Sequence, residues 1–79
     1  MKTIIDYNEA FGGYCYRVTA NNHVAHIQEK TPRSNRFVTR AKLLRAQFDA
    51  LAKERDLYNV YDQNPAKLWH LIEHFGAEY

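Results

Sequence analysis

The sequence predicts a single α+β domain over residues 1–79, in which a small antiparallel sheet of about three strands packs against one long and one short helix. Three patterns support this fold class. Apolar and polar residues alternate from residue 14 to residue 30, apolar residues recur at helical spacing from about residue 40, and a proline and a glycine bracket residues 65 to 75. A chain of 79 residues has apolar surface for only one modest core, so a second domain is not expected.

A short strand is expected over residues 3 to 7, where apolar and β-favouring side chains predominate. Gly12 and Gly13 then give the backbone the freedom to turn into the next strand. Residues 36 to 38 suit either a further edge strand or the entry to the next helix, and residue preferences alone leave both open.

A β-hairpin is expected at residues 14 to 30, with its turn at Asn21 and Asn22. Asparagine tolerates the positive φ of a two-residue type I′ turn, and such a turn places Val18 opposite Ala25. One face of the hairpin then holds Tyr16, Val18, Ala20, Ala25 and Ile27. The other face holds Cys15, Arg17, Thr19, Val24, His26 and Gln28. We therefore expect the sheet to pack against the helices on its apolar face only.

A long helix is expected from about Arg40, with Thr39 as its N-cap. Its first apolar stripe consists of Leu44, Phe48, Leu51 and Tyr58. A second stripe, about 100 to 120° around the helix, consists of Leu43, Ala46, Ala50 and Leu57. If the last helix leaves this second stripe uncovered, it would form the seam of a homodimer.

The last helix is expected over residues 65 to 75, because Asn64 is suited to the N-cap, Pro65 to the first helical position and Gly76 to a left-handed C-terminal residue. Its apolar face consists of Leu68, Leu71, Ile72 and Phe75. Trp69 lies on the flank of that face.

The composition points to a cytoplasmic protein without a membrane segment. Cys15 is the single cysteine, so an intramolecular disulfide is impossible, whereas secreted domains of this size usually need several. No apolar run approaches the roughly 18 residues of a transmembrane helix, and the first residues lack the apolar region of a signal peptide.

The motifs associated with catalysis or metal binding are weak. Residues 70 to 74 match H-x-x-E-H, but both histidines lie away from the apolar face of their helix, and no third ligand is indicated. His23 and His26 leave opposite faces of a strand and cannot chelate one ion. Cys15 lacks an evident base, and the chain has no glycine-rich phosphate loop. We therefore expect no catalytic residue, no metal and no cofactor.

The strongest candidate for a functional site is the run of six cations within residues 30 to 45, which contains no acid. These like charges repel one another, and an anionic partner would offset the repulsion. The alternative is that they face the acids of residues 49 to 78 within the fold. The predicted partner-binding residues are Arg33, Arg36, Arg40, Lys42 and Arg45, with Arg17 of the hairpin and Trp69 of the last helix.

These features favour a non-catalytic binding protein that occupies the surface of a larger macromolecule, in the manner of small inhibitors and adaptors encoded by phages and mobile elements. Its partner would present an acidic surface or be a nucleic-acid-handling assembly, such as a CRISPR or transcription complex. The alternative is a protein that binds DNA or RNA directly, with the same arginines on phosphates. An enzyme is the third class, but no spacing of nucleophile, base and electrophile supports it.

Overall fold

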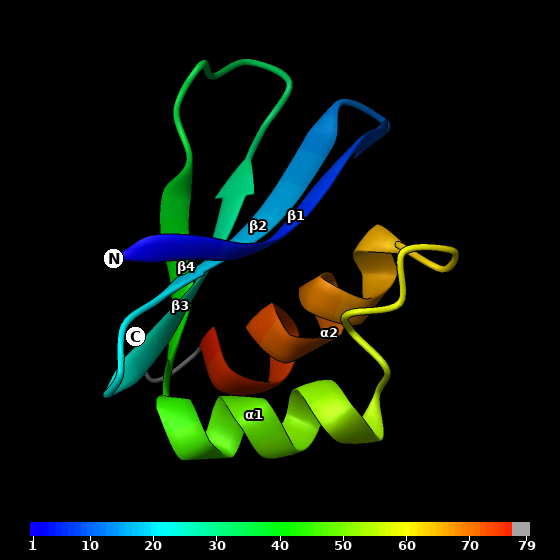
Figure 1. Ribbon diagram of the computed structural model, residues 1–79. Helices are drawn as coiled ribbons and strands as arrows, with labels where there is room; N and C mark the ends of the chain where they lie inside the picture. The colour runs from blue at the N-terminus through cyan, green and yellow to red at the C-terminus, as the bar shows by residue number, and fades with distance from the viewer. Residues whose placement is uncertain (77–79) are drawn as a thin grey trace.

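The computed structural model describes residues 1–76, apart from the side chains of residues 8–11, and shows an α+β fold (Figure 1). In chain order the elements are β1 (Lys2–Phe11), β2 (Tyr14–Ala20), β3 (Val24–Lys30), β4 (Val38–Leu44), α1 (Arg45–Glu54) and α2 (Pro65–Phe75). The strands form one antiparallel sheet in the order β1-β2-β3-β4, and both helices pack against it. The predicted fold class is confirmed, with one strand more than expected.

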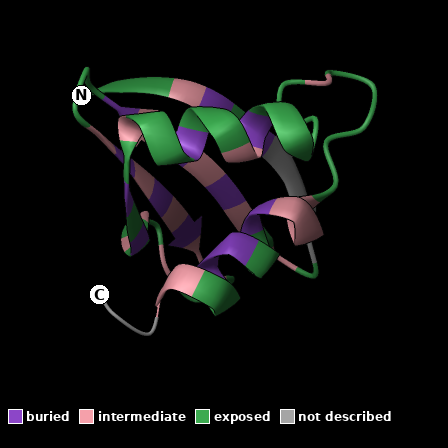
Figure 2. Ribbon diagram, turned by 90° about the horizontal axis from the view of Figure 1, so that it is seen from below, coloured by how far each residue is buried: buried purple, intermediate pink, exposed green. Residues whose placement is uncertain are grey.

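Alternation along the strands decides which side chains enter the core, as the colouring of the sheet in Figure 2 shows. On the face toward the helices the buried apolar residues are Ile5, Tyr7, Tyr16, Val18, Ala20, Ala25, Ile27, Ala41 and Leu43. The helices and the loop between them contribute Phe48, Ala52, Leu57, Leu68, Leu71 and Ile72. All five apolar residues of the predicted hairpin face are in this core, so the predicted face is confirmed.

The register of the β2–β3 hairpin differs from the predicted one by two residues. Val18 lies opposite Ile27 rather than Ala25, so the connection is a longer loop than the predicted type I′ turn. Asn21 has no positive φ, and its Oδ1 accepts hydrogen bonds from the backbone N–H groups of His23 and Val24 at 2.8 and 2.9 Å. Strand side chains alternate with a period of two, so a shift of two residues leaves every side chain on its predicted face.

The segment expected to begin the long helix is instead a strand. β4 runs through Thr39 and Arg40, and α1 begins only at Arg45, so Thr39 is not an N-cap. The edge of β3 presents backbone N–H and C=O groups that need partners, and β4 supplies them. In doing so it places Ala41 and Leu43 on the apolar face of the sheet. Tertiary pairing therefore overrides the local helical spacing.

α1 is shorter than predicted and buries little of the two predicted stripes. Phe48 is buried, but Leu44 belongs to β4, Tyr58 lies in the loop after the helix, and both are exposed. Ala46 and Ala50 of the second stripe are also exposed. The apolar periodicity thus ran across a strand, a helix and a loop, and it does not describe two faces of one helix.

A β-bulge in β4 changes the direction of one side chain. The register shifts between Ile27 and Gln28, which makes Arg40 the extra residue. Strict alternation would place Arg40 on the same face as Lys42. The bulge instead brings its guanidinium beside the buried Glu29, with 3.3 Å between Nη1 and Oε1.

α2 follows the prediction at its start and departs from it at its end. Pro65 is its first residue, and Asn64 Oδ1 accepts a 3.0 Å hydrogen bond from the backbone N–H of Ala66. Gly76 has a φ of −72°, so the expected left-handed conformation was wrong. Glycine is still required at position 76 because of a close approach. A Cβ on Gly76 would lie 2.8 Å from the carbonyl oxygen of Arg40.

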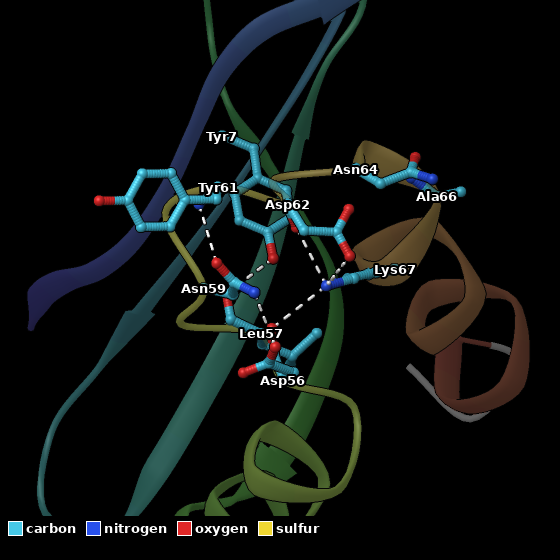
Figure 3. Close-up of polar contacts among 9 residues, drawn as sticks. All are labelled: Tyr7, Asp56, Leu57, Asn59, Tyr61, Asp62, Asn64, Ala66 and Lys67. Atoms are coloured by element: carbon cyan, nitrogen blue, oxygen red, sulfur yellow. Dashed lines mark hydrogen bonds and ion pairs between the residues drawn. The ribbon is translucent and has the colours of Figure 1, made fainter.

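The loop between α1 and α2 is fastened by Lys67 (Figure 3). Its Nζ donates to the carbonyl oxygens of Asp56 and Asp62 at 3.2 and 3.0 Å and pairs with the Asp62 carboxylate at 3.0 Å. Asn59 Nδ2 donates to the Asp56 carboxylate, and Asn59 Oδ1 accepts from the backbone N–H of Tyr61, both at 2.9 Å. The loop therefore has a defined shape, and the Tyr61 ring points away from the cluster in Figure 3.

Candidate binding surface

The outer face of the sheet is the face opposite the helices, and its side chains remain open to a partner. Both helices of the described chain contact the core on the other side. Along β2 and β3 the outer-face residues are partly exposed and alternate with buried ones. The outer face includes Cys15, Arg17, Thr19, Val24, His26, Gln28, Lys30, Thr39 and Lys42.

A row of polar side chains crosses this face from β2 to β4. Arg17 Nε donates a 2.6 Å hydrogen bond to Gln28 Oε1, and Gln28 Nε2 donates a 3.1 Å hydrogen bond to Thr39 Oγ1. The three residues lie directly opposite one another in the strand registers. Asp6 lies opposite Arg17 on the other side and lowers the local positive charge. The row fixes the direction of the Arg17 side chain, and within the described residues it uses one of the five N–H donors of Arg17.

Phe37 brings two cations together at the end of the same face. The Arg17 guanidinium carbon lies 4.0 Å from the centre of the Phe37 ring, and Lys30 Nζ lies 5.9 Å from it. Stacking holds a guanidinium in place and leaves its edge available for a carboxylate or phosphate. Phe37 therefore acts as a platform that presents positive charge.

His26 and Lys42 are opposite each other on β3 and β4. Burial lowers the pKa of His26 from its ordinary value, and the nearby charge of Lys42 lowers it further. The Nε2 atom of His26 is buried and has no hydrogen-bond partner among the described residues. His26 is therefore neutral at pH 7, and the positive charge of this pair resides on Lys42.

The β3–β4 loop adds two exposed arginines, Arg33 and Arg36. Ser34 shapes the loop, because its backbone N–H donates to the Thr31 carbonyl oxygen and its hydroxyl accepts from the backbone N–H of Arg36, both at 3.1 Å. Neither arginine is within ion-pair distance of an acid among the described residues.

The outer face and the adjoining loop thus share one chemical character. We call their five cations the basic outer surface, which consists of Arg17, Lys30, Arg33, Arg36 and Lys42. No member of this surface forms an ion pair within the part of the chain that the structure describes. Four of the seven predicted partner-binding residues belong to it, and Lys30 joins them.

The other three predicted residues lie elsewhere. Arg40 is on the helix side of the sheet and pairs with Glu29. Arg45 begins α1, where its Nε pairs with Asp49 Oδ1 at 2.9 Å. Trp69 is exposed on α2. The basic segment is therefore divided, because two of its arginines form ion pairs with acids of the fold and lie away from the outer face.

Phe37 was not predicted as a site residue, and Lys30 belonged to the predicted basic run but not to the predicted partner-binding residues, although one signal could have added it. Residue 30 has the same parity as His26 and Gln28, so strand alternation places it on the outer face. Phe37 follows an irregular loop, and no periodicity would have placed its ring beside Arg17.

The weak chemical motifs gain no support from the geometry. His70 and His74 are exposed on α2, and His70 Nδ1 lies 3.9 Å from Glu73 Oε1. Cys15 is a free, partly buried thiol. Across residues with described side chains, no group of three or more His, Cys, Asp or Glu is placed to hold a metal ion.

Comparisons of the chain with models of known protein families, with curated proteins and with solved structures found no match. Among the described helices, none is long and apolar enough to cross a membrane. The functional assignment therefore rests on the geometry of the basic outer surface.

Proposed function

We propose that this protein is a non-catalytic binding protein that contacts the phosphate backbone of a nucleic acid through the basic outer surface. The observation that carries the proposal is a set of five cations on the outer face of the sheet and on the adjoining β3–β4 loop, none of them ion-paired with an acid among the described residues. Like charges in so small an area repel one another. A polyanion offsets this repulsion and releases its own counterions on binding.

The dimensions of the surface suit several phosphates. Arg36 and Lys42 are six residues apart along β4 and its entry, a segment that spans at most about 20 Å when fully extended. A DNA strand carries a phosphate for about every 3.4 Å of helix axis, so several lie within that length. Gln28 and Thr39 lie on the same face and carry hydrogen-bonding groups, as do the strands of proteins that read DNA with a sheet.

Among the described residues, the scarcity of aromatic side chains on the basic outer surface favours phosphates over an acidic protein surface. Protein interfaces usually centre on tyrosine, tryptophan or arginine side chains that fill a pocket. On the basic outer surface the described aromatic residue is Phe37, which is partly covered by Arg17 and Lys30. The exposed Tyr58 and Tyr61 are in the α1–α2 loop instead.

The test is the affinity for labelled DNA and RNA, single-stranded and duplex, measured by fluorescence anisotropy over a range of salt concentrations. A surface that contacts about three to five phosphates should lose roughly 40- to 500-fold in affinity between about 50 and 200 mM salt. The double variant Arg33→Gln/Arg36→Gln should bind more weakly and reduce the salt slope by about two. The matched control is Lys53→Gln/Arg55→Gln, which removes the same charge from exposed positions at the end of α1.

Three results would contradict the proposal. The first is the absence of binding to all four nucleic acids at low salt. The second is an affinity that does not change with salt. The third is an equal loss in the α1 control, which would mean that total charge, and not this surface, determines binding.

A protein partner is the second candidate, and the α1–α2 loop is the observation that favours it. Tyr58, Val60 and Tyr61 are 51%, 69% and 96% exposed, yet the contacts of Lys67 hold the loop in one shape. A loop whose backbone is already held in place loses less entropy on binding than a flexible one. In this case the protein would act as an inhibitor or adaptor on the surface of a nucleic-acid-handling complex.

The two candidates are separable by one pair of variants. Tyr58→Ala/Tyr61→Ala should abolish nuclease-resistant capture of a protein partner if the loop is the anchor, and it should leave nucleic-acid affinity unchanged. Arg33→Gln/Arg36→Gln should weaken nucleic-acid binding, and leave any capture of a protein partner unchanged, if the basic outer surface binds phosphates.

A further inference from the structure

A hollow of about 650 Å³ lies on the helix side of the sheet, next to the beginning of α2. Side chains from three strands and one helix line it, so it is formed only in the folded chain. The residues that matter here are Tyr14, Tyr16, Glu29, Thr31, Arg40 and Trp69. Its volume is in the range of sites that hold small molecules.

The floor of the hollow is an acid that is already paired. Glu29 is buried, and its Oε2 accepts a 2.8 Å hydrogen bond from the Tyr16 hydroxyl. Its Oε1 accepts from Arg40 Nη1 at 3.3 Å. The Glu29 side chain is 10% exposed and that of Arg40 is 52% exposed. Arg40 therefore lies nearer the solvent, and a molecule that enters the hollow meets the cation before the acid.

Arg40 is held in one orientation while most of its hydrogen-bonding capacity stays open. A guanidinium has five N–H donors, and the bond to Glu29 uses one. The others make no hydrogen bond within the described residues, and the β-bulge sets the direction of the side chain. A guanidinium supported from behind by a carboxylate is suited to a bidentate pair with an incoming carboxylate or phosphate.

Aromatic side chains form the walls. The indole of Trp69 and the phenol of Tyr14 both line the hollow and are both exposed. Aromatic faces bind planar rings by stacking and bury apolar area at little entropic cost. Thr31 also lines the hollow, and the amino end of α2 adds a small positive potential.

We propose that this hollow binds a planar organic anion. Its carboxylate or phosphate pairs with Arg40, and its ring lies against Trp69 and Tyr14. This site is on the helix side of the sheet and shares no residue with the basic outer surface, so it does not rest on the proposed function.

Two classes of molecule combine a planar ring with an anionic group. One is a nucleotide, and the other is an aromatic carboxylate such as the last residue of a peptide. Trp69 is the single tryptophan of the chain, so its fluorescence and its indole N–H resonance report directly on the hollow. The probes are adenosine monophosphate and N-acetyl-phenylalanine. Each has a neutral counterpart, adenosine and N-acetyl-phenylalanine amide. We expect a saturable change in the Trp69 signals with at least one anion, and binding about tenfold or more weaker for its neutral counterpart.

The residue test is Arg40→Gln, which should weaken binding of the anion by about tenfold or more. Arg45→Gln is the matched control, since it removes the same charge at the start of α1 and should bind normally. Circular dichroism checks that Arg40→Gln folds, because the change removes a partner of Glu29. Arg40→Lys keeps the charge without the planar fork and should bind with intermediate affinity. Tyr14→Ala leaves the Arg40–Glu29 pair intact and should weaken binding through the lost wall.

The anion that binds shows whether the ligand is a nucleotide or an aromatic carboxylate, and binding of either class supports the proposal. The proposal is overturned if neither anion produces a saturable change. It is also overturned if the neutral counterparts bind equally well, or if folded Arg40→Gln, Arg40→Lys and Tyr14→Ala all retain the original affinity.

Discussion

The hydroxyl group of Tyr7 on β1 donates a 2.7 Å hydrogen bond to the backbone carbonyl oxygen of Leu57 in the α1–α2 loop (Figure 3). Both residues are buried, and they are 50 positions apart in the chain. The bond therefore ties the loop that presents Tyr58 and Tyr61 to the first strand of the sheet. It acts together with the contacts that Lys67 makes on the other side of the same loop.

Replacement of Tyr7 by Phe should lower the free energy of unfolding by about 1 to 2 kcal/mol, because it leaves the buried Leu57 carbonyl without its partner. The measurement is urea denaturation followed by circular dichroism. Tyr61→Phe is the control, since Tyr61 is exposed and its hydroxyl makes no hydrogen bond within the described residues. Equal stability of the two variants would mean that the Tyr7 bond does not contribute.

Stability should fall in alkaline solution because two buried tyrosines resist ionisation. Burial, with a contribution from Asp62 and Asp56, raises the pKa of Tyr7 to about 12, and burial together with the Glu29 hydrogen bond raises the pKa of Tyr16. The ordinary tyrosine value is 10.0. Above it the unfolded chain releases protons that the folded protein keeps, so the free energy of unfolding is unaffected below pH 10 and decreases as the pH rises toward 12.

The alkaline prediction is tested by urea midpoints measured at intervals from about pH 8 to about pH 11.5. Tyr7→Phe, although less stable at neutral pH, should lose less stability over the alkaline range than the parent protein. An identical pH dependence in the two proteins would show that Tyr7 ionises alike in the folded and unfolded states.

The titration of His26 should report on the charge of Lys42. Its pKa is lowered in the folded protein, so its contribution to stability is present above the ordinary value of 6.5 and is lost as the pH falls through the folded-state pKa. Lys42→Gln should raise the pKa of His26 part of the way toward 6.5, because burial remains. NMR titration of the imidazole resonances measures the pKa of His26 in the parent protein and in Lys42→Gln. The control Lys53→Gln should leave the titration unchanged.

The same resonance offers a check on the proposed function. A phosphate bound beside Lys42 would stabilise the protonated imidazole, so saturating nucleic acid should raise the pKa of His26. No change on binding would place the phosphates away from the His26 and Lys42 pair.

Gly12 and Gly13 should respond differently to alanine, although both have positive φ values, 60° and 88°. A Cβ on Gly12 meets no atom within 4 Å, so Gly12→Ala should cost about 1 to 2 kcal/mol from backbone strain alone. A Cβ on Gly13 would lie 2.6 Å from Pro32 Cγ, so Gly13→Ala should cost more because the β3–β4 loop must also move. Thermal denaturation measures both, and equal losses would mean that the Pro32 contact is easily relieved.

Two elements were predictable because their signals are local. The hairpin faces follow from alternation, which survives the error of two residues in the register. The start of α2 follows from Asn64 and Pro65, whose effects act on the adjacent backbone. β4 was not predictable in this way, because its residues have a helical spacing of apolar side chains and become a strand by pairing with β3.

The same distinction between local and long-range effects applies to the candidate site. The concentration of cations in residues 30 to 45, the polar face of the hairpin and the start of α2 at Pro65 all follow from the order of the residues. Which of these cations share a surface depends on the folding of the whole chain. Strand alternation directs Lys42 outward, the bulge turns Arg40 inward to Glu29, and the ring of Phe37 collects Arg17 and Lys30. The direction of a strand side chain depends on backbone register, which is set by partners distant in the chain, whereas helix capping depends only on residues nearby in the sequence.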